Sequence, residues 1–548
     1  MNSKSKFVTL VLSSIFSLLV TEQGVYSTER ESPTGEDWLE HVREDLNPWW
    51  NQPAAWGDPI GNYPSYRCDN GEVVDTSSFL CYPYNVVNSH HYVNNKVIVS
   101  HSRQIYTYGA AYQLTGNPEF LSLAKAGVDW LLENGIDREK GGTYHITNNP
   151  NIDPLRRNAQ QQAYAIQGLT FYYYLTGDKQ ILREINQLHN HIVDNYYDFD
   201  NKRIKMFPDE VEAESITRIQ DPLDQLNSYL LLLASVAPER QQRRYTRQLV
   251  SISNILISEF YSPEDNIFWD RIDEPEQQTL APGNANYGNS IKAMWMIYLT
   301  GKLADNQELI EFGETNIPRL LAQAYDQESG TWTNAPYLNE EGERVNDLEK
   351  SWWIYAVFNQ TAGTLSLEDD SLMDTYLNST INWWFENMVD REHYEVWNTL
   401  TYPELEPIKQ KQYPWKNGYH SYEHALVGYI TSQGTAGEPV ELYFAPKRVL
   451  GAEFRPYYFS GDIVEVEVSR MPFLEQDNFP DISRYRQALV TFDNIGLNTA
   501  INRRNDLVFS TFDEVQLLDE PTTVPEPVTI LATIFVAVII PVMGQHKK

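Results

Sequence analysis

The sequence is short of positive charge. Its 548 residues contain 42 Lys and Arg against 75 Asp and Glu, which gives a formal net charge of −33. A surface of that sign repels DNA and RNA, so we expect no nucleic-acid partner. Hydrophobic residues make up 42% of the chain and aromatic residues 13%. This composition excludes a disordered chain and is sufficient for a large buried core.

Cysteine and cofactor motifs are also scarce. Neither standard glycine-rich phosphate-loop spacing occurs, so no nucleotide cofactor is expected. The two cysteines, Cys68 and Cys81, have no further ligands at metal-site spacing, so no metal is expected either. In an exported chain such a pair predicts a disulfide, and closing so short a loop contributes roughly 3 kcal/mol on the chain-entropy model.

Long apolar runs stand only at the two ends of the chain. At the N-terminus, Lys4 and Lys6 precede the apolar run 7–20, and the small residue Ser27 follows it. This order predicts a cleaved signal peptide over 1–27. An uncleaved membrane anchor is the alternative, although the run is short for a full span.

At the C-terminus, the motif Pro525-Glu526-Pro527 precedes an apolar run, 528–543, and a tail that ends in two lysines. This order resembles the PEP-CTERM sorting signal of Gram-negative bacteria, whose three parts are recognised by an exosortase-type enzyme. The resemblance implies a transmembrane segment and basic tail over 528–548 that anchor the chain until processing. A plain tail anchor is the alternative. Both ends predict an exported protein of the cell envelope or extracellular space.

The central part of the chain repeats with a period of about 62 residues. Leu-Thr-Gly begins at 114, 175 and 299, so the first interval is 61 residues and the second is 124, or twice 62. Turns rich in Asp, Gly and aromatic residues recur in phase at 137–144, 198–207, 262–269, 326–332 and 390–397. Apolar residues at helical spacing fill the intervals. Each unit therefore predicts a helix, a glycine turn, a second helix and an acidic turn.

Six such helical hairpins predict a mainly α fold, a closed (α/α)6 toroid over 85–437. An open solenoid is the alternative. An N-terminal extension, 28–84, precedes the toroid. After it, β-branched runs predict a small β-rich module over 438–515, followed by an acidic, proline-containing linker over 516–527. The module could bind glycan, dock on the toroid or mediate a homodimer.

Four segments of the predicted toroid resemble the N-acylglucosamine 2-epimerase family, which also contains cellobiose and mannose 2-epimerases and aldose–ketose isomerases. The four segments are 102–106, 162–165, 350–353 and 414–420, within a resemblance that spans roughly 85–435. The resemblance implies a mono- or oligosaccharide substrate and removal of a proton beside the sugar carbonyl. Two bases on opposite faces of the sugar perform that step in an epimerase, and His suits it because its pKa lies near neutral pH.

The resemblance assigns two catalytic roles directly. His420 matches the family's closing His, the general acid/base, and Arg103 matches the Arg that binds the carbonyl oxygen. Asn289 stands where the family has its second catalytic His, and Lys292 replaces the family's Glu. Asn has no titratable proton near neutral pH, and one remaining base suffices for an aldose–ketose isomerisation. The substrate-binding candidates are Tyr106, Gln162, Lys292, Lys350, Trp352, Trp353 and Trp415.

Acidic residues near these motifs leave other functions open. Glu423 and His424 follow His420 at helical spacing, so the three share one side of a helix. His424 is either a substrate-binding group beside catalytic Glu423 or a buried core residue. Two carboxylates across the mouth of the toroid, Asp221 or Asp224 with Glu423, suit a glycoside hydrolase or lyase. A non-catalytic glycan-binding protein is the third hypothesis, since the second family His is absent.

Overall fold

The computed structural model describes residues 32–74, 96–147, 157–198, 201–208, 216–472, 474 and 479–497. The predicted signal peptide, linker and C-terminal segment lie outside these ranges, as does Cys81. Cys68 lies within them and is disulfide-bonded. No helix in the described ranges is long and apolar enough to cross a membrane.

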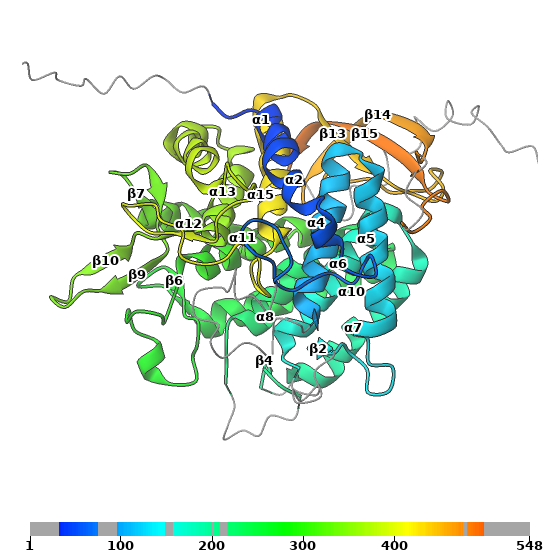
Figure 1. Cartoon of the computed structure of the whole chain (residues 1–548). Coiled ribbons are helices and arrows are strands. Elements are labelled where there is room, and N and C mark those ends of the chain that lie inside the picture. The colour runs from blue at the N-terminus through cyan, green and yellow to red at the C-terminus, as the bar shows by residue number, and fades with distance from the viewer. Residues whose placement is uncertain are drawn as a thin grey trace, which may run out of the picture.

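Six inner helices form the wall of a ring. They are α4 (Ile98–Thr115), α6 (Ala159–Thr176), α8–η5–α9 (Gln220–Gln225, Leu226–Leu230 and Leu231–Val236), α11 (Tyr287–Ala304), α13 (Trp352–Ser366) and α15 (Gly418–Ala436). Each packs against the next, and α15 packs against α4, so the ring is closed (Figure 1). Almost all residues of these helices are buried, as expected for helices covered on every side. The molecule is therefore a closed helical toroid and not an open solenoid.

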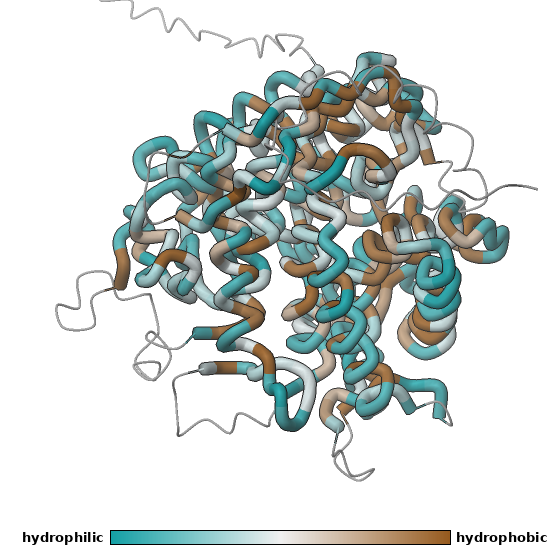
Figure 2. The backbone as a smooth tube through the Cα atoms, turned by 90° about the vertical axis from the view of Figure 1, so that its right-hand side faces the viewer, coloured by the Kyte–Doolittle hydropathy of each residue, from teal (hydrophilic) through white to brown (hydrophobic). Residues whose placement is uncertain are grey.

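Outer helices cover this wall and turn their polar faces to solvent. Five follow their inner partners in sequence: α5 (Pro118–Trp130) with η3 (Leu131–Gly135), α7 (Lys179–Tyr196), α10 (Glu239–Ile255) with η6 (Leu256–Phe260), α12 (Gln307–Ala324), and α14 (Asn378–Trp383) between η8 (Met373–Leu377) and η9 (Trp384–Met388). In α7, Ile181, Ile185, Leu188 and Ile192 are buried at helical spacing. This spacing makes the single apolar stripe of a surface helix, and Figure 2 shows brown and teal alternating along the outer helices.

Two of the three Leu-Thr-Gly markers end an inner helix, whereas Gly301 of the third marker lies inside α11, which continues to Ala304. Gly116 and Gly177 end α4 and α6 in the left-handed region, with φ of 68° and 61°. Three acidic turns are antiparallel hairpins: β3 (Tyr197–Asp198) with β4 (Arg203–Ile204), β5 (Tyr261–Ser262) with β6 (Ile267–Phe268), and β7 (Tyr325–Asp326) with β8 (Thr331–Trp332). Further short pairs are β1 (Lys96–Val97) with β2 (Ile146–Thr147), β9 (Ala335–Leu338) with β10 (Arg344–Asp347), and β11 (Lys350–Ser351) with β12 (Thr399–Leu400).

The sixth outer helix comes from the N-terminal end of the chain, which corrects the predicted domain boundary. The segment α1–η1–α2 (Gly35–Glu40, His41–Leu46 and Asn47–Trp50) packs against α15. Trp38 lies against Gly428 of α15, where any side chain would collide with the indole ring. Residues 35–50, predicted to belong to an extension, are thus part of the toroid. The repeat did not reveal them because the last hairpin joins segments from opposite ends of the ring.

A three-stranded antiparallel sheet covers the end of the ring where the inner helices terminate. Its strands are β13 (Val440–Phe444), β14 (Ser460–Arg470) and β15 (Arg486–Gly496), in the order β13-β15-β14. Tyr112 OH donates a hydrogen bond to the carbonyl of Phe444 at 3.0 Å, and the Ala445 N–H donates to the carbonyl of Leu175 at 2.9 Å. In Figure 1 this sheet lies at the opposite end of the ring from β2 and β4. Of the three roles open for the β-rich module, docking on the toroid is the one observed.

Candidate active site

Polar side chains from five inner helices meet inside the ring at the end away from the sheet. Each stands in the first two turns of its helix: Arg103 on α4, Tyr164 on α6, Asp224 on α8, Lys292 on α11 and His420 on α15. All five residues are buried. We call these five residues the lumen cluster. It brings together Arg103, Lys292, Asp224 and His420, which the sequence had already marked as candidates.

Asp224 is held by three donors. Its Oδ1 accepts hydrogen bonds from Lys292 Nζ at 2.7 Å and Tyr164 OH at 3.0 Å, and its Oδ2 accepts from Gln160 Nε2 at 2.7 Å. Burial disfavours the charge of Lys292, but the Asp224 carboxylate outweighs burial and raises the pKa of the lysine. The three donors engage both oxygens of the carboxylate within the protein. The pairing therefore disfavours Asp224 as a catalytic group of a glycoside hydrolase.

Arg103 is fixed by a carbonyl and by aromatic rings. Its Nη1 donates to the carbonyl oxygen of Trp415 at 2.8 Å. Its guanidinium carbon lies 3.9 Å from the ring centre of Tyr164 and 5.5 Å from that of Tyr419, within cation–π range. In the described part of the chain, Arg103 Nε has no hydrogen-bond partner. The guanidinium therefore keeps donor capacity for a ligand oxygen, beside the partly exposed Trp415 ring.

His420 stands among aromatic rings on the first turn of α15. Its ring centre is 4.3 Å from that of Tyr419, 6.1 Å from that of Trp352 and 6.2 Å from that of Trp353. Burial lowers the pKa of His420 well below its usual value, and the positive charges of Arg103 and Lys292 act in the same direction. The imidazole is therefore neutral at physiological pH and can accept a proton.

Glu423 lies one turn deeper on the same helix. Its Oε2 is 3.9 Å from His420 Nδ1, and its Oε1 accepts a hydrogen bond from Tyr457 OH at 2.8 Å. Burial raises the pKa of Glu423 to about 7, although the Tyr457 hydrogen bond opposes this shift. His420 and Glu423 thus form an imidazole–carboxyl pair in which the carboxyl titrates near neutral pH.

Asn289 holds a carboxyl group that the sequence motifs did not mark. Asn289 Nδ2 donates to Asp270 Oδ1 at 2.8 Å, and Asn286 Nδ2 donates to Asp270 Oδ2 at 2.8 Å. Burial raises the pKa of Asp270 to about 6, against the lowering effect of both amides and of the Lys292 charge. The available signal was position: Asp270 directly follows the third acidic turn, 262–269.

Two predicted sugar-binding groups are engaged in the scaffold instead. Lys350 Nζ donates to the carbonyl of Trp332 at 3.0 Å, and burial lowers the pKa of Lys350 to about 8. Gln162 Nε2 donates to the carbonyl of Thr143 at 2.9 Å, and its Oε1 accepts from the Thr143 N–H at 2.8 Å. Lys350 joins β11 to β8, and Gln162 joins α6 to the turn at residue 143, so we do not assign either side chain to the lumen.

Of the two roles open for His424, the structure shows the buried core residue, and Asp221 is engaged in an ion pair. His424 lies on the outer side of α15, where its ring centre is 4.6 Å from Trp38 and 4.5 Å from Trp384, both on outer helices. Asp221 forms an ion pair with Arg218, with Nη2 and Oδ1 3.0 Å apart. Four residues along a helix turn the side-chain direction by about 40°, and His424 lies one turn further along α15, where it packs against the outer helices.

A buried ion pair anchors the segment that precedes α15. Glu395 Oε1 accepts from Lys416 Nζ at 2.9 Å and from Ser421 Oγ at 2.6 Å, and its Oε2 accepts from Trp50 Nε1 at 2.6 Å. Burial would raise the pKa of Glu395, but the Lys416 charge and these donors outweigh it and lower the pKa. This network joins α2, α15 and the 390–397 turn, and so positions the start of the helix that carries His420.

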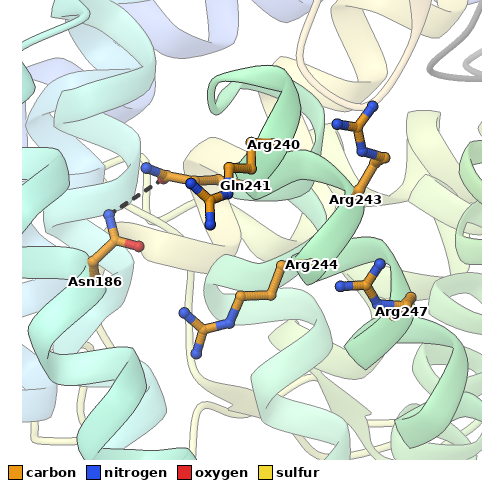
Figure 3. Close-up of a pocket in the computed structure, with 6 residues that line it drawn as sticks. All are labelled: Asn186, Arg240, Gln241, Arg243, Arg244 and Arg247. Atoms are coloured by element: carbon orange, nitrogen blue, oxygen red, sulfur yellow. Dashed lines mark hydrogen bonds between the residues drawn. The ribbon is translucent and has the colours of Figure 1, made fainter.

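A basic groove lies on the outer surface, apart from the lumen. It encloses about 490 Å³ and is lined by Asn186, Arg240, Gln241, Arg243, Arg244 and Arg247 of α7 and α10 (Figure 3). Arg243 pairs with Glu239 at 2.6 Å, and Arg244 Nη2 donates to Asn190 Oδ1 at 2.7 Å.

Within the described ranges, no three His, Cys, Asp or Glu side chains gather as they would around a metal ion.

Comparison with known proteins identifies the family. The family model of N-acylglucosamine 2-epimerase (GlcNAc 2-epimerase) matches residues 88–423, more than half of the chain. The cellobiose 2-epimerase of Ruminococcus albus is 23% identical over 348 residues, which is 60% of this chain and 85% of that protein.

Solved structures agree on the fold. A sugar epimerase from a ruminal bacterium superposes with a TM-score of 0.58 at 21% identity, over 74% of this chain and 99% of that one. A D-mannose isomerase superposes with a TM-score of 0.58 at 15% identity, over 71% of this chain and 96% of that one. Both share the toroid, and the match over residues 88–423 contains the lumen cluster. The chain belongs to the N-acylglucosamine 2-epimerase family of carbohydrate epimerases and isomerases.

Proposed function

We propose that the protein transfers a proton at C2 of a reducing sugar bound in the lumen. The observation that carries the proposal is His420, a neutral buried imidazole set between Trp352, Trp353 and Tyr419. A neutral imidazole is a suitable base for a proton next to a carbonyl. The aromatic rings offer the apolar faces on which sugar rings stack.

Arg103 supplies the complementary charge in this proposal. Removing the C2 proton leaves an enediolate, whose negative oxygen needs a donor that is already in place. The guanidinium is held by the Trp415 carbonyl and the Tyr164 ring, and its Nε is free of partners among the described residues. In this proposal Arg103 binds the carbonyl oxygen.

Asp270 is the second proton-carrying group of the proposal. Epimerisation requires a proton to return to the face opposite His420, and Asn289 has no proton to give. The carboxyl that Asn289 holds has a pKa of about 6, close to that of an unperturbed His. We assign the second step to Asp270, and a 2-epimerase requires such a second group whereas a one-base isomerase does not.

Solvent exchange tests this function. The protein is incubated in D2O with cellobiose, glucose and mannose, and products are followed by NMR. Deuterium at C2 with an inverted C2 centre supports the epimerase, and a ketose product supports the isomerase. Binding without exchange would instead favour the non-catalytic hypothesis, and new reducing ends without exchange would favour a hydrolase.

Asp270→Asn is expected to reduce epimer formation by about 10²- to 10⁴-fold, because the isosteric amide cannot carry a proton. Exchange of the C2 proton by His420 should persist. The matched control is Asp273→Asn, three residues further along the connection that follows β6, which removes a carboxylate paired with Arg271. Equal epimer yields from Asp270→Asn and the wild type would show that Asp270 is not the second base.

We also propose that the toroid works outside the cytoplasm, anchored at its C-terminus until processing. The order of charged, apolar and small residues at both ends supports export, and so does the disulfide-bonded state of Cys68, because disulfides persist in oxidising compartments. Fractionation of a Gram-negative host that expresses the full chain tests this. Recovery of an uncleaved chain in the cytoplasm would contradict it.

A further inference from the structure

The connection between β13 and β14 enters the ring from the sheet side. It carries Tyr457 and Tyr458, whose exposed fractions are 1% and 3%. Tyr457 OH donates to Glu423 Oε1 at 2.8 Å and accepts from Tyr106 OH at 3.2 Å. Tyr458 OH donates to the carbonyl of Asn227 at 3.2 Å. The two tyrosines thus close the lumen beneath Glu423, with side chains that lie beyond the family match at 88–423.

Tyr457 is held in a backbone conformation that aromatic residues rarely adopt. Its φ is +54°, in the left-handed region. Its N–H donates to Tyr174 OH at 3.0 Å, and Arg455 donates to the carbonyls of Tyr457 and Tyr458 at 3.1 Å each. Unfavourable backbone conformations persist where the surroundings over-determine them, and they are concentrated at functional sites. Here the conformation directs the Tyr457 hydroxyl to Glu423.

Glu423 lies between Tyr457 and His420. One carboxyl oxygen accepts from Tyr457, and the other lies 3.9 Å from His420 Nδ1, a distance that can shorten when substrate binds. The titratable and charged groups around Glu423 are Tyr106 of α4, Lys292 of α11, Tyr419 and His420 of α15, and Tyr457 and Tyr458 of the connection. The charged groups around His420 are Arg103, Lys292 and Lys416.

We infer that Tyr457 is a positioning residue of the active site, which orients Glu423 so that His420 carries its proton on Nδ1 and keeps Nε2 free as the base. An ionised Glu423 accepts from both the tyrosine and the imidazole N–H. A protonated Glu423 instead donates to Nδ1 and leaves the proton of the imidazole on Nε2, where it blocks base catalysis. The C-terminal sheet therefore supplies part of the site, an inference that rests on the proposed function for its role in catalysis.

Tyr457→Phe tests the inference against a matched variant. The hydrogen bond from Tyr457 favours the ionised carboxyl, so its loss raises the pKa of Glu423 above about 7. The acid limb of the pH profile of C2 exchange should move to higher pH by about one unit. Tyr458→Phe removes the hydroxyl of the other buried tyrosine on this connection. That hydroxyl donates to a backbone carbonyl and not to Glu423. This variant should lower the thermal midpoint to a similar extent and leave the acid limb in place.

A second measurement separates this inference from the proposed function. Difference infrared spectra of each variant against its Glu423→Gln partner titrate the Glu423 carboxyl directly, without substrate. A raised carboxyl pKa in Tyr457→Phe alone supports the inference. Equal pKa values in Tyr457→Phe, Tyr458→Phe and the wild type overturn it. If the wild type exchanges no C2 proton with any sugar, the proposed function fails, and the infrared titration still decides whether Tyr457 controls Glu423.

Discussion

His420→Asn is expected to lower C2 proton exchange by about 10³-fold, within the range that a single general base contributes. The variant keeps a polar side chain of moderate size among Trp352, Trp353 and Tyr419, so the rings stay covered. The rate of deuterium incorporation from D2O measures the effect. Substrate binding by calorimetry should change far less than the rate, because Arg103 and the aromatic rings remain.

The control for His420→Asn lies one turn along the same helix. His424→Phe keeps an aromatic ring against Trp38 and Trp384, on the outer side of α15. Its exchange rate should stay within a few-fold of the wild type. Loss of exchange in His424→Phe, or its survival in His420→Asn, would show that the lumen side of α15 does not carry the base.

Glu395→Ala is expected to produce the largest loss of stability, about 3–5 kcal/mol, because it leaves the Lys416 ammonium buried without a counter-ion. Chemical denaturation at neutral pH measures the change. The folded state holds the pKa of Glu395 below its usual 4.5, so the contribution of the pair is complete above that pH and is lost as the pH falls below it. The variant should therefore lose less of its remaining stability on acidification than the wild type.

Two further variants serve as comparisons for the stability of Glu395→Ala. The double change of Glu395→Gln with Lys416→Met removes both charges and should recover much of the loss. Glu239→Ala breaks the exposed pair with Arg243, and exposed pairs contribute no more than about 1 kcal/mol. If Glu395→Ala is as mild as Glu239→Ala, the buried pair does not stabilise the ring.

Local patterns predicted much of the fold. The Leu-Thr-Gly repeat located the ends of α4 and α6, because a glycine at the left-handed position leaves a direct mark in the sequence. The alternating run at 440–444 became β13. The segment 35–50 was missed because its partner, α15, lies almost 400 residues away in the sequence, and no local rule links Trp38 to Gly428.

The sequence predicted the site residues that stand on inner helices and missed those that stand on connections. Arg103, Lys292 and His420 meet in the lumen, because each stands near the start of an inner helix and the ring brings those starts together. Asp270 and Tyr457 were not marked because they stand on connections, whose course depends on tertiary contacts. His424 was a candidate by spacing alone. When a helix is covered on all sides, spacing does not show which of its faces lines the lumen.

The closure of the ring by α1–η1–α2 has a consequence for how the chain folds. During synthesis this first segment emerges before α15 exists, so its aromatic residues have no groove to fill until nearly the whole toroid has been made. The pairing spans the full circumference and raises the mean sequence separation of contacts, which slows folding. Trp38 of the N-terminal segment and Ile495 of the sheet both pack against α15. The ring is therefore complete only after segments from both sides of the toroid sequence have reached this helix.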